Sequence, residues 1–473
     1  MEKIIGRKQE IAQLKQCYDS GKPEMVIVYG RRRIGKTFLV RETFANQFDF
    51  YLTGLFKKSK AKQLENFANV LAEYSGEEIK TPKTWYDAFR QLKHYLSGIS
   101  RPGRKLVFLD EVPWMDTRRS DFVSALENFW NGWGSGENDV MLVVCGSATA
   151  WIMDKLLGDK GGLFNRDTER IYLEQFTLKE TESYLQSNGI SLSRHEVVEC
   201  YMIMGGVPYY LSNMRKGMSL SQNIDNIFFK KNPLLKNEFE HLYNALFSTS
   251  ETYIKIVEEL SKTTIGLTRE EIAAKISISS GGNLSRMLDN MINSDLIRLD
   301  SYYGHVKKDA VYQLSDFFTI FYFKYLKQQS TDENYWCNHQ DSSTHSAWSG
   351  LAFEQVCFAH IRQIKAKLGI TGVASEYYAW RNNVNGGAQI DLIIDRNDNI
   401  INLCEIKFWK KEFTLTQAIS KNIENKIEIF GKVSKGRKTV HPVMITTYGL
   451  AKSKYNDLIQ NSITLDDLFR ENS

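Results

Sequence analysis

A glycine-rich loop near the amino terminus has the residue types and spacing to bind phosphate. Residues 30–37 read Gly-Arg-Arg-Arg-Ile-Gly-Lys-Thr, which is the pattern G-x-x-x-x-G-K-T. Backbone N–H groups of such a loop hold phosphate oxygens, its lysine reaches the β- and γ-phosphates, and its threonine hydroxyl is a ligand of Mg²⁺. We expect ATP with Mg²⁺ here, bound by Gly30, Arg31, Arg32, Arg33, Ile34, Gly35, Lys36 and Thr37.

Two acids at the end of a predicted strand suit the chemistry of a bound triphosphate. Asp110 and Glu111 follow the apolar run 105–109, about 70 residues after the loop. Asp110 would hold the Mg²⁺ shell, and Glu111 would orient or deprotonate the attacking water. An apolar strand that ends in Asp-Glu is common by chance, but at this distance from a complete phosphate loop it predicts nucleotide hydrolysis.

Three further residues are candidates for the same reaction. Ser147 follows the predicted strand 140–145 and either senses the γ-phosphate or caps the next helix. Arg166 is the first candidate for an arginine finger that stabilises charge on the transferred phosphoryl group, and Arg170 is the second. The alternative for both arginines is an exposed place on a solvated turn.

A second set of charged residues lies near the carboxyl terminus. Asp391 belongs to the run 390–395, and Glu405 and Lys407 belong to the run 402–407, with Asn-Asp-Asn between the runs. This pattern predicts two antiparallel strands, with Glu405 and Lys407 facing the same way and Asp391 opposite them. Two carboxylates would hold Mg²⁺ or Mn²⁺, which activates a water, and Lys407 would position that water or neutralise the transition state. Glu354, on a preceding helix, could join the cluster.

The elements that must position these residues change in type along the chain. Predicted strands at 24–29, 48–55, 105–110, 140–145 and 170–174 alternate with helices, which indicates a parallel sheet covered on both faces. A helical stretch follows from 178 to about 237. Residues 250–325 read as three helices and two short strands, with Thr268 and Glu271 as a capping box. The polar stretch 328–346 has little to bury and is predicted to be a linker.

Composition limits the classes of protein to which this chain can belong. The 473 residues suggest roughly three domains, and 42% hydrophobic with 25% charged residues is typical of soluble globular proteins. No apolar run approaches the roughly 20 residues of a membrane span. Six scattered cysteines, no secretory signal and no C-x-x-C pair favour a reducing cytoplasm and no membrane partner. The net charge of +5 is compatible with nucleic acid without requiring it.

The first part of the chain resembles AAA-type ATPases and, more closely, the prokaryotic archaeal-type ATPase family. The resemblance rests on residues 5–10, the loop 30–37, the run 110–114, Gly146-Ser147 and the run 205–210. In the family a Gly-x-Pro element of a helical lid closes over the nucleotide, which implies this role for Gly206 and Pro208. Glycines 205 and 206 could instead simply end a helix. The resemblance extends over almost the whole chain, but it is specific only in the first third.

Two other segments resemble known modules. Residues 250–325 resemble a winged helix-turn-helix, but the third helix offers only Arg286 beside Asp289, and His305, Lys307 and Lys308 lie in the expected wing. Contact with DNA and a role as a connector or docking unit are both left open. The end of the chain resembles the PD-(D/E)xK nuclease superfamily. Gln389 and Ile390 stand in place of the motif's proline, and Gln417 matches a polar position of some members.

Together these patterns predict an α/β fold with a phosphate-loop parallel sheet, a helical lid, a winged helix and a carboxy-terminal α/β restriction-endonuclease-like domain. The expected ranges are 1–176, 177–240, 241–327, a linker at 328–346, and 347–473. The expected function is a cytoplasmic, DNA-directed ATPase whose nucleotide state is coupled to a metal-dependent nuclease-like domain. The alternative is a nucleotide-driven switch that only binds a protein or DNA. A transporter subunit and a kinase are disfavoured, and the oligomeric state is open.

Overall fold

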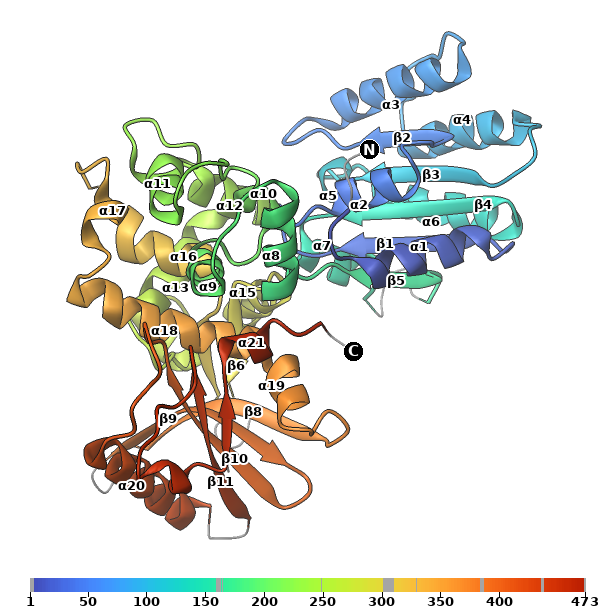
Figure 1. Cartoon of the computed structure of the whole chain (residues 1–473). Coiled ribbons are helices and arrows are strands. Elements are labelled where there is room, and N and C mark those ends of the chain that lie inside the picture. Colours follow the sequence, from blue (N-terminus) through green and yellow to red (C-terminus); the bar gives the residue numbers. More distant parts are fainter. Residues whose placement is uncertain are drawn as a thin grey trace. The chain divides into compact units, whose positions relative to one another are not determined.

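The computed structural model describes residues 4–158, 163, 165–247, 249–300, 310–328, 330–382, 387–434 and 438–471 (Figure 1). It consists of two compact units. The first contains Met1–Gln175 and Asn244–Ser248, and the second contains Phe176–Tyr243 and Thr249–Ser473. Within the described residues, no helix combines the length and apolarity needed to cross a membrane. All six cysteines are free thiols.

The first unit is built on a five-stranded sheet in the order β2-β3-β4-β1-β5. All neighbouring strands are parallel, which confirms the predicted parallel sheet. Strand β2 is shorter than the predicted 48–55. The order places β4 between the strand that leads into the phosphate loop and the strand that ends in the acids. The strands are β1 (Glu24–Tyr29), β2 (Phe50–Thr53), β3 (Lys105–Asp110), β4 (Val140–Gly146) and β5 (Glu169–Tyr172).

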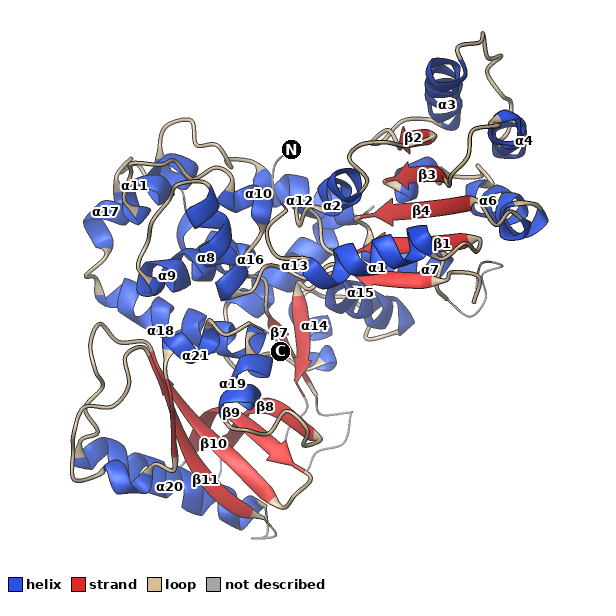
Figure 2. Ribbon diagram, turned by 45° about the vertical axis from the view of Figure 1, so that its right-hand side comes forward, coloured by secondary structure: helices blue, strands red, loops and turns tan. Residues whose placement is uncertain are grey.

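Helices cover both faces of this sheet (Figure 2). Met25 and Ile27 of β1 pack in one apolar cluster with residues of α4 and α6, whereas Val26 and Val28 pack in another with residues of α1 and α2. Every residue in the centre of β1 is therefore buried, as expected for a doubly covered parallel strand. The helices are α1 (Lys8–Asp19), α2 (Lys36–Thr43), α3 (Lys60–Ser75), α4 (Trp85–Gly98), α5 (Val112–Met115), α6 (Phe122–Gly132) and α7 (Thr149–Lys155).

The second unit begins with the predicted helical stretch. Its helices are α8 (Leu178–Ser187), α9 (Arg194–Met204), α10 (Pro208–Leu211), α11 (Leu220–Ile224), a π-helical turn (Asp225–Phe229) and α12 (Glu238–Leu246), within which the division between the units falls. The structure differs from the prediction in the segment 328–346, which the sequence predicts to be a linker. It contains α17 (Tyr335–His339), and Trp336 is 2% exposed. The Asp225 carboxylate accepts from the N–H groups of Trp336 and Cys337, so this short helix is fixed at its amino end.

The middle segment has the predicted order of elements. Three helices, α13 (Ser250–Ser261), α14 (Arg269–Lys275) and α15 (Gly282–Asn293), precede the antiparallel strands β6 (Ile297–Asp300) and β7 (Val311–Leu314). The capping box of Thr268 and Glu271 is confirmed. His305, Lys307 and Lys308 of the expected wing lie outside the described residues. After β7 come α16 (Phe317–Phe321) and a π-helical turn (Tyr322–Leu326).

The carboxy-terminal part contains a five-stranded sheet in the order β12-β11-β10-β9-β8. Strands β8, β9 and β10 are antiparallel, and β10, β11 and β12 are parallel. The predicted strand pair is confirmed by β9 and β10. The elements are α18 (Ser343–Ala359), α19 (Ile361–Lys367), β8 (Ser375–Asn382), β9 (Ala388–Arg396), β10 (Ile400–Lys407), α20 (Gln417–Val433), β11 (Thr439–Thr446), β12 (Asn461–Ile463) and α21 (Leu465–Leu468).

A buried histidine joins two helices of the second unit. His360, 1% exposed at the end of α18, donates from Nδ1 to the Val356 carbonyl oxygen at 2.8 Å. Its Nε2 accepts from the Leu178 N–H at 2.9 Å, at the start of α8. Only the neutral ring can form both bonds at once, because Nε2 accepts a hydrogen bond only when it carries no proton. Burial lowers the pKa of His360 to about 4, against an ordinary value of 6.5.

This histidine predicts a pH-dependent stability. Between about pH 6.5 and pH 4 the unfolded chain binds a proton at His360 that the folded chain does not. The free energy of unfolding should therefore fall by about 3 kcal/mol as the pH is lowered through this range. Chemical unfolding of the wild type and of His360→Gln at several pH values measures this, with the exposed His339→Gln as control. An equal pH dependence in all three proteins would contradict the prediction.

Candidate functional site

The phosphate loop connects β1 to α2 in a tight turn. Gly30 has a φ of 139°, and a Cβ there would lie 2.5 Å from the Leu173 carbonyl oxygen, so the loop requires glycine at this position. The Lys36 ammonium donates to the carbonyl oxygens of Gly30 and Arg31 at 2.9 and 2.8 Å. Burial lowers the pKa of Lys36, which is 5% exposed. The loop therefore curls around the ammonium group that is predicted to bind phosphate.

The two predicted Mg²⁺ ligands of this site are brought together by the fold. The Thr37 hydroxyl donates to Asp110 Oδ2 at 2.9 Å, although 73 positions separate the residues in sequence. Asp110 is 3% exposed, and burial together with the negative charge of Glu111 raises its pKa to about 6. A hydroxyl and a carboxylate in contact provide oxygen ligands of the kind that Mg²⁺ prefers, so the residues present fit a Mg²⁺–nucleotide.

Glu111 is held by Ser147 at the end of β4. Glu111 has a φ of 50°, in the left-handed region that few residues other than glycine adopt. The Ser147 hydroxyl lies 2.7 and 2.8 Å from the two Glu111 carboxylate oxygens, and the Ser147 N–H donates to Oε2 at 3.0 Å. The residue at the amino-terminal cap of α7 is Ala148, without a side-chain hydrogen bond. The Ser147 hydroxyl is therefore engaged with Glu111 rather than with the helix.

The other residues predicted for nucleotide hydrolysis are not part of this contact network. Arg166 is exposed in a turn, and Arg170 is exposed and paired with the Asp167 carboxylate. Gly206, in the second unit, packs closely on the chain: a Cβ would lie 2.3 Å from the Phe176 carbonyl oxygen. Gly205 ends α9 and Pro208 begins α10, which agrees with the alternative that the glycines here simply end a helix. Contact of Gly206 and Pro208 with nucleotide stays a prediction.

The carboxy-terminal acids and lysine meet as predicted. The register places Leu392 opposite Cys404, and the Asp391 carboxylate accepts from the Ile406 N–H at 2.9 Å. The Lys407 ammonium lies 2.7 Å from Glu405 and 3.7 Å from Asp391. Burial and the charge of Glu405 raise the pKa of Asp391, whereas the neighbouring lysines help to lower that of Glu405 against the opposing effect of its burial.

Two more residues of this site come from helices. Burial and the charge of Asp391 raise the pKa of Glu354, on α18, to about 8. Lys426, on α20, forms an ion pair of 2.6 Å with Glu405 and was missed by the sequence reasoning. One feature of the sequence could have indicated this role: Lys426 is a lysine at the centre of an apolar helix face, next to Ile423 and Ile427. Gln417, the sequence candidate on the same helix, is exposed.

This site offers few protein ligands to a metal ion. Within the described residues, no three or more His, Cys, Asp or Glu side chains form a group that could hold a metal. Asp391 and Glu405 are two carboxylates, and Mg²⁺ is commonly held by one or two carboxylates together with waters and substrate phosphates. The residues present therefore fit a metal that arrives with a phosphate substrate rather than one held by the protein alone.

A groove begins at the residues that follow Lys407. It has a volume of about 840 Å³, and Phe408, Trp409, Lys410, Lys411 and Tyr448 line one part of it. Trp409 and Tyr448 are 49% and 47% exposed. Exposed aromatic rings beside lysines can stack bases and attract phosphates. Four basic residues lie close together in the sequence between 432 and 438. Of these, Lys432 pairs with Glu428 and Lys438 with Asp395, and Lys435 and Arg437 lie outside the described residues.

Comparison with known proteins supports the nucleotide site at the phosphate loop. Residues 4–214 match the family described as "ATPase domain predominantly from Archaea". The amino-terminal part of this chain is an archaeal-type ATPase domain. This membership supports ATP as the nucleotide of the loop and ATP hydrolysis as the activity.

Two curated relatives are similar to this chain over very different lengths. An uncharacterized protein of Methanocaldococcus jannaschii is 24% identical over 417 residues, which are 86% of this chain and 88% of the relative. An uncharacterized ATP-binding protein of the same organism is 37% identical over 44 residues, 9% of this chain and 75% of its own. Among solved structures, the Walker-type ATPase of Pyrococcus abyssi is 13% identical with a TM-score of 0.49, over 68% of this chain and 96% of that one. The ORC2 protein of Aeropyrum pernix is 13% identical with a TM-score of 0.43, over 69% and 95%.

Proposed function

We propose that this chain hydrolyses ATP with Mg²⁺ at the phosphate loop and acts on DNA. The observation that carries the ATPase proposal is the convergence of the loop residue Thr37 with Asp110, beside a Glu111 held by Ser147. The loop amides and Lys36 would bind the phosphates. Thr37 and Asp110 would hold the Mg²⁺, which neutralises phosphate charge when bound.

The remaining steps of hydrolysis are assigned to residues outside the loop. Glu111 would accept a proton from the attacking water, and Ser147 would set the direction of its carboxylate. Arg166 would stabilise charge on the transferred group, in the same chain or toward a neighbouring subunit. Gly206 and Pro208 would contact the nucleotide from the helical segment. Each of these roles can be tested by substituting one residue at a time.

The ATPase proposal is tested most directly by removing the loop ammonium. A Lys36→Ala variant is expected to lose ATP binding, or turnover, because Lys36 supplies the positive charge that the loop curls around. Calorimetry with a non-hydrolysable ATP analogue and a phosphate-release assay measure the two quantities. Lys58→Ala, an exposed lysine of the same unit, is the matched control. Wild-type affinity and turnover in Lys36→Ala would refute a nucleotide site at this loop.

For the carboxy-terminal part we propose metal-dependent cleavage of DNA. Asp391 and Glu405 would hold Mg²⁺ or Mn²⁺ together with a phosphate of the substrate, and Lys407 would hold the attacking water or offset developing negative charge. The part of the groove that starts at Phe408 supports a nucleic acid as the substrate, because it combines exposed aromatic rings with lysines, whereas Glu196 and Glu199 line another part. Residues 348–473 also carry 17 Lys and Arg against 13 Asp and Glu, which is +4 of the net +5 of the chain.

A second candidate function is a nucleotide-driven switch that binds a protein or DNA without cleaving it. The observation in its favour is that both carboxylate oxygens of Glu405 are already neutralised, by Lys407 at 2.7 Å and Lys426 at 2.6 Å. A metal ion would have to compete with two ammonium groups. Small-angle scattering of the chain with ATP and with ADP distinguishes this candidate, because a switch requires two different profiles.

A further inference from the structure

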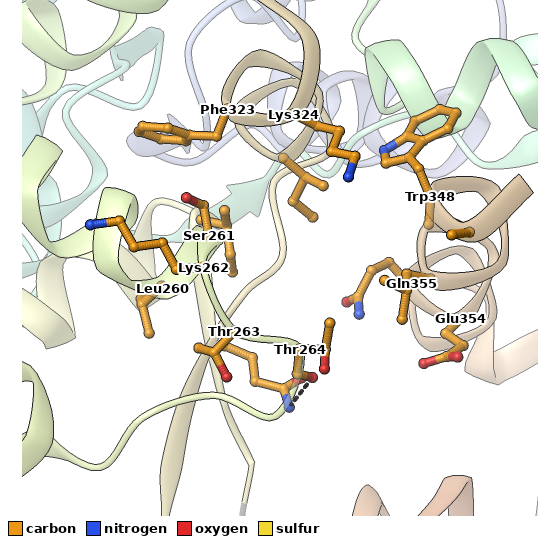
Figure 3. A pocket seen from close by; sticks show the side chains of 16 residues that line it. Leu260, Ser261, Lys262, Thr263, Thr264, Phe323, Lys324, Trp348, Glu354 and Gln355 are labelled. Carbon is orange, nitrogen blue, oxygen red and sulfur yellow. Dashed lines mark hydrogen bonds between the residues drawn. The ribbon is translucent and has the colours of Figure 1, made fainter. Parts of the chain in front are cut away.

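A cavity of about 270 Å³ lies in the second unit, whereas the phosphate loop belongs to the first (Figure 3). Glu354, which belongs to the carboxy-terminal site, lies at its rim. Its walls come from the end of α13, from β7, from the helical turns at 317–326 and from one face of α18. Much of the wall is apolar and is formed by Leu260, Leu314, Ile320, Phe323 and Leu351. Such a wall favours a ligand with an apolar body.

One buried polar group faces this cavity. Trp348, on α18, is 3% exposed, and its buried Nε1–H has no hydrogen-bond partner among the described residues. Figure 3 shows the nitrogen edge of the indole directed into the cavity. A buried donor left unpaired costs about 1–3 kcal/mol, so a ligand atom that accepts from this N–H is favoured.

One charged group directed into the cavity, the Lys324 ammonium, favours an anion. Figure 3 shows the Lys324 ammonium directed into the cavity, and in the described part of the chain it forms no ion pair. The Lys262 ammonium, by contrast, points away and pairs with Glu259 at 2.6 Å. Gln355 accepts with Oε1 from Arg298, and Glu354 lies at the rim beside it. The Lys324 ammonium and the Trp348 indole N–H are thus two donors directed into the cavity.

We propose that this cavity binds a small organic anion, with an aromatic or aliphatic body against the apolar wall and a carboxylate that accepts from Lys324 and Trp348. Ligand pockets commonly have volumes of about 300–1,000 Å³. A volume of about 270 Å³ therefore suits a single small molecule rather than a peptide or a dinucleotide. An ammonium and an indole N–H give the carboxylate one charge-assisted and one neutral hydrogen bond.

The test uses two probes of nearly equal shape, 2-naphthoate and its uncharged amide, 2-naphthamide. Calorimetric titration of the full chain is expected to show one site for the naphthoate and at least about tenfold weaker binding of the amide. Lys324→Met should weaken naphthoate binding at least about tenfold and leave the amide unchanged. Trp348→Phe, which removes the N–H but keeps an aromatic ring, should weaken both. Lys262→Met is the control and should bind as the wild type does.

Some results would overturn the proposal. If naphthoate does not bind the wild type, or binds Lys324→Met and Lys262→Met equally well, the cavity is not an anion site. Equal affinity for the acid and the amide would also overturn the proposal, because it would show that the charge of the ligand is not recognised. Unfolding curves of each variant confirm that a loss of binding is not a loss of the fold.

Discussion

A Glu111→Gln variant is expected to bind ATP with wild-type affinity and to hydrolyse it at least about 100-fold more slowly. Glutamine has nearly the same shape, and it retains a carbonyl oxygen that accepts from the Ser147 hydroxyl or N–H. It lacks the basic carboxylate that would take a proton from the attacking water. Binding should therefore survive while the chemical step is lost, which calorimetry and phosphate release measure separately.

The controls for this prediction separate chemistry from structure. Glu73→Gln, at an exposed position on α3, should leave both quantities unchanged. Ser147→Ala should slow turnover less than Glu111→Gln, because it removes the hydroxyl contacts of the carboxylate but keeps the backbone N–H bond and the base itself. Wild-type turnover in Glu111→Gln would remove the catalytic role proposed for that residue. Loss of ATP binding in the same variant would show that Glu111 is needed for the structure of the site.

Cleavage of DNA by the wild type with Mg²⁺ or Mn²⁺ is expected to fall at least about 100-fold in Asp391→Ala. Asp391 and Glu405 are the two carboxylates of the site, and a metal held by one of them alone would be bound weakly. Linear and plasmid DNA, each with and without ATP, are the substrates. The comparison with and without ATP also measures whether the nucleotide state controls cleavage.

Two further variants make this result interpretable. Asp391 also accepts from the buried Ile406 N–H, so alanine leaves that group unpaired, whereas Asp391→Asn retains an acceptor and removes the charge. Asp398→Ala is the control, at the exposed turn between β9 and β10. No cleavage by the wild type under any combination, or undiminished cleavage in both Asp391 variants, would reject the nuclease proposal and favour the switch.

The sequence alone determined the features that depend on local pattern. The spacing in residues 30–37 predicts a phosphate loop, and the apolar runs beside it predict the parallel strands of the first sheet. The two-residue period of a strand places Glu405 and Lys407 on one side, and their ion pair of 2.7 Å agrees. In these cases neighbours in sequence decide the outcome, because the period of a strand or the turn of a loop is set within a few residues.

Only the tertiary structure decided the contacts between distant segments. Lys426 neutralises Glu405 from a helix 21 positions away, Ser147 holds Glu111 across 36 positions, and His360 meets Leu178 across 182. The cavity beside Trp348 is likewise formed by segments that are separate in sequence. Local periodicity states which face of an element is apolar, but not which other element covers that face. Partners, burial and the resulting pKa values are therefore settled by packing, which is a property of the whole chain.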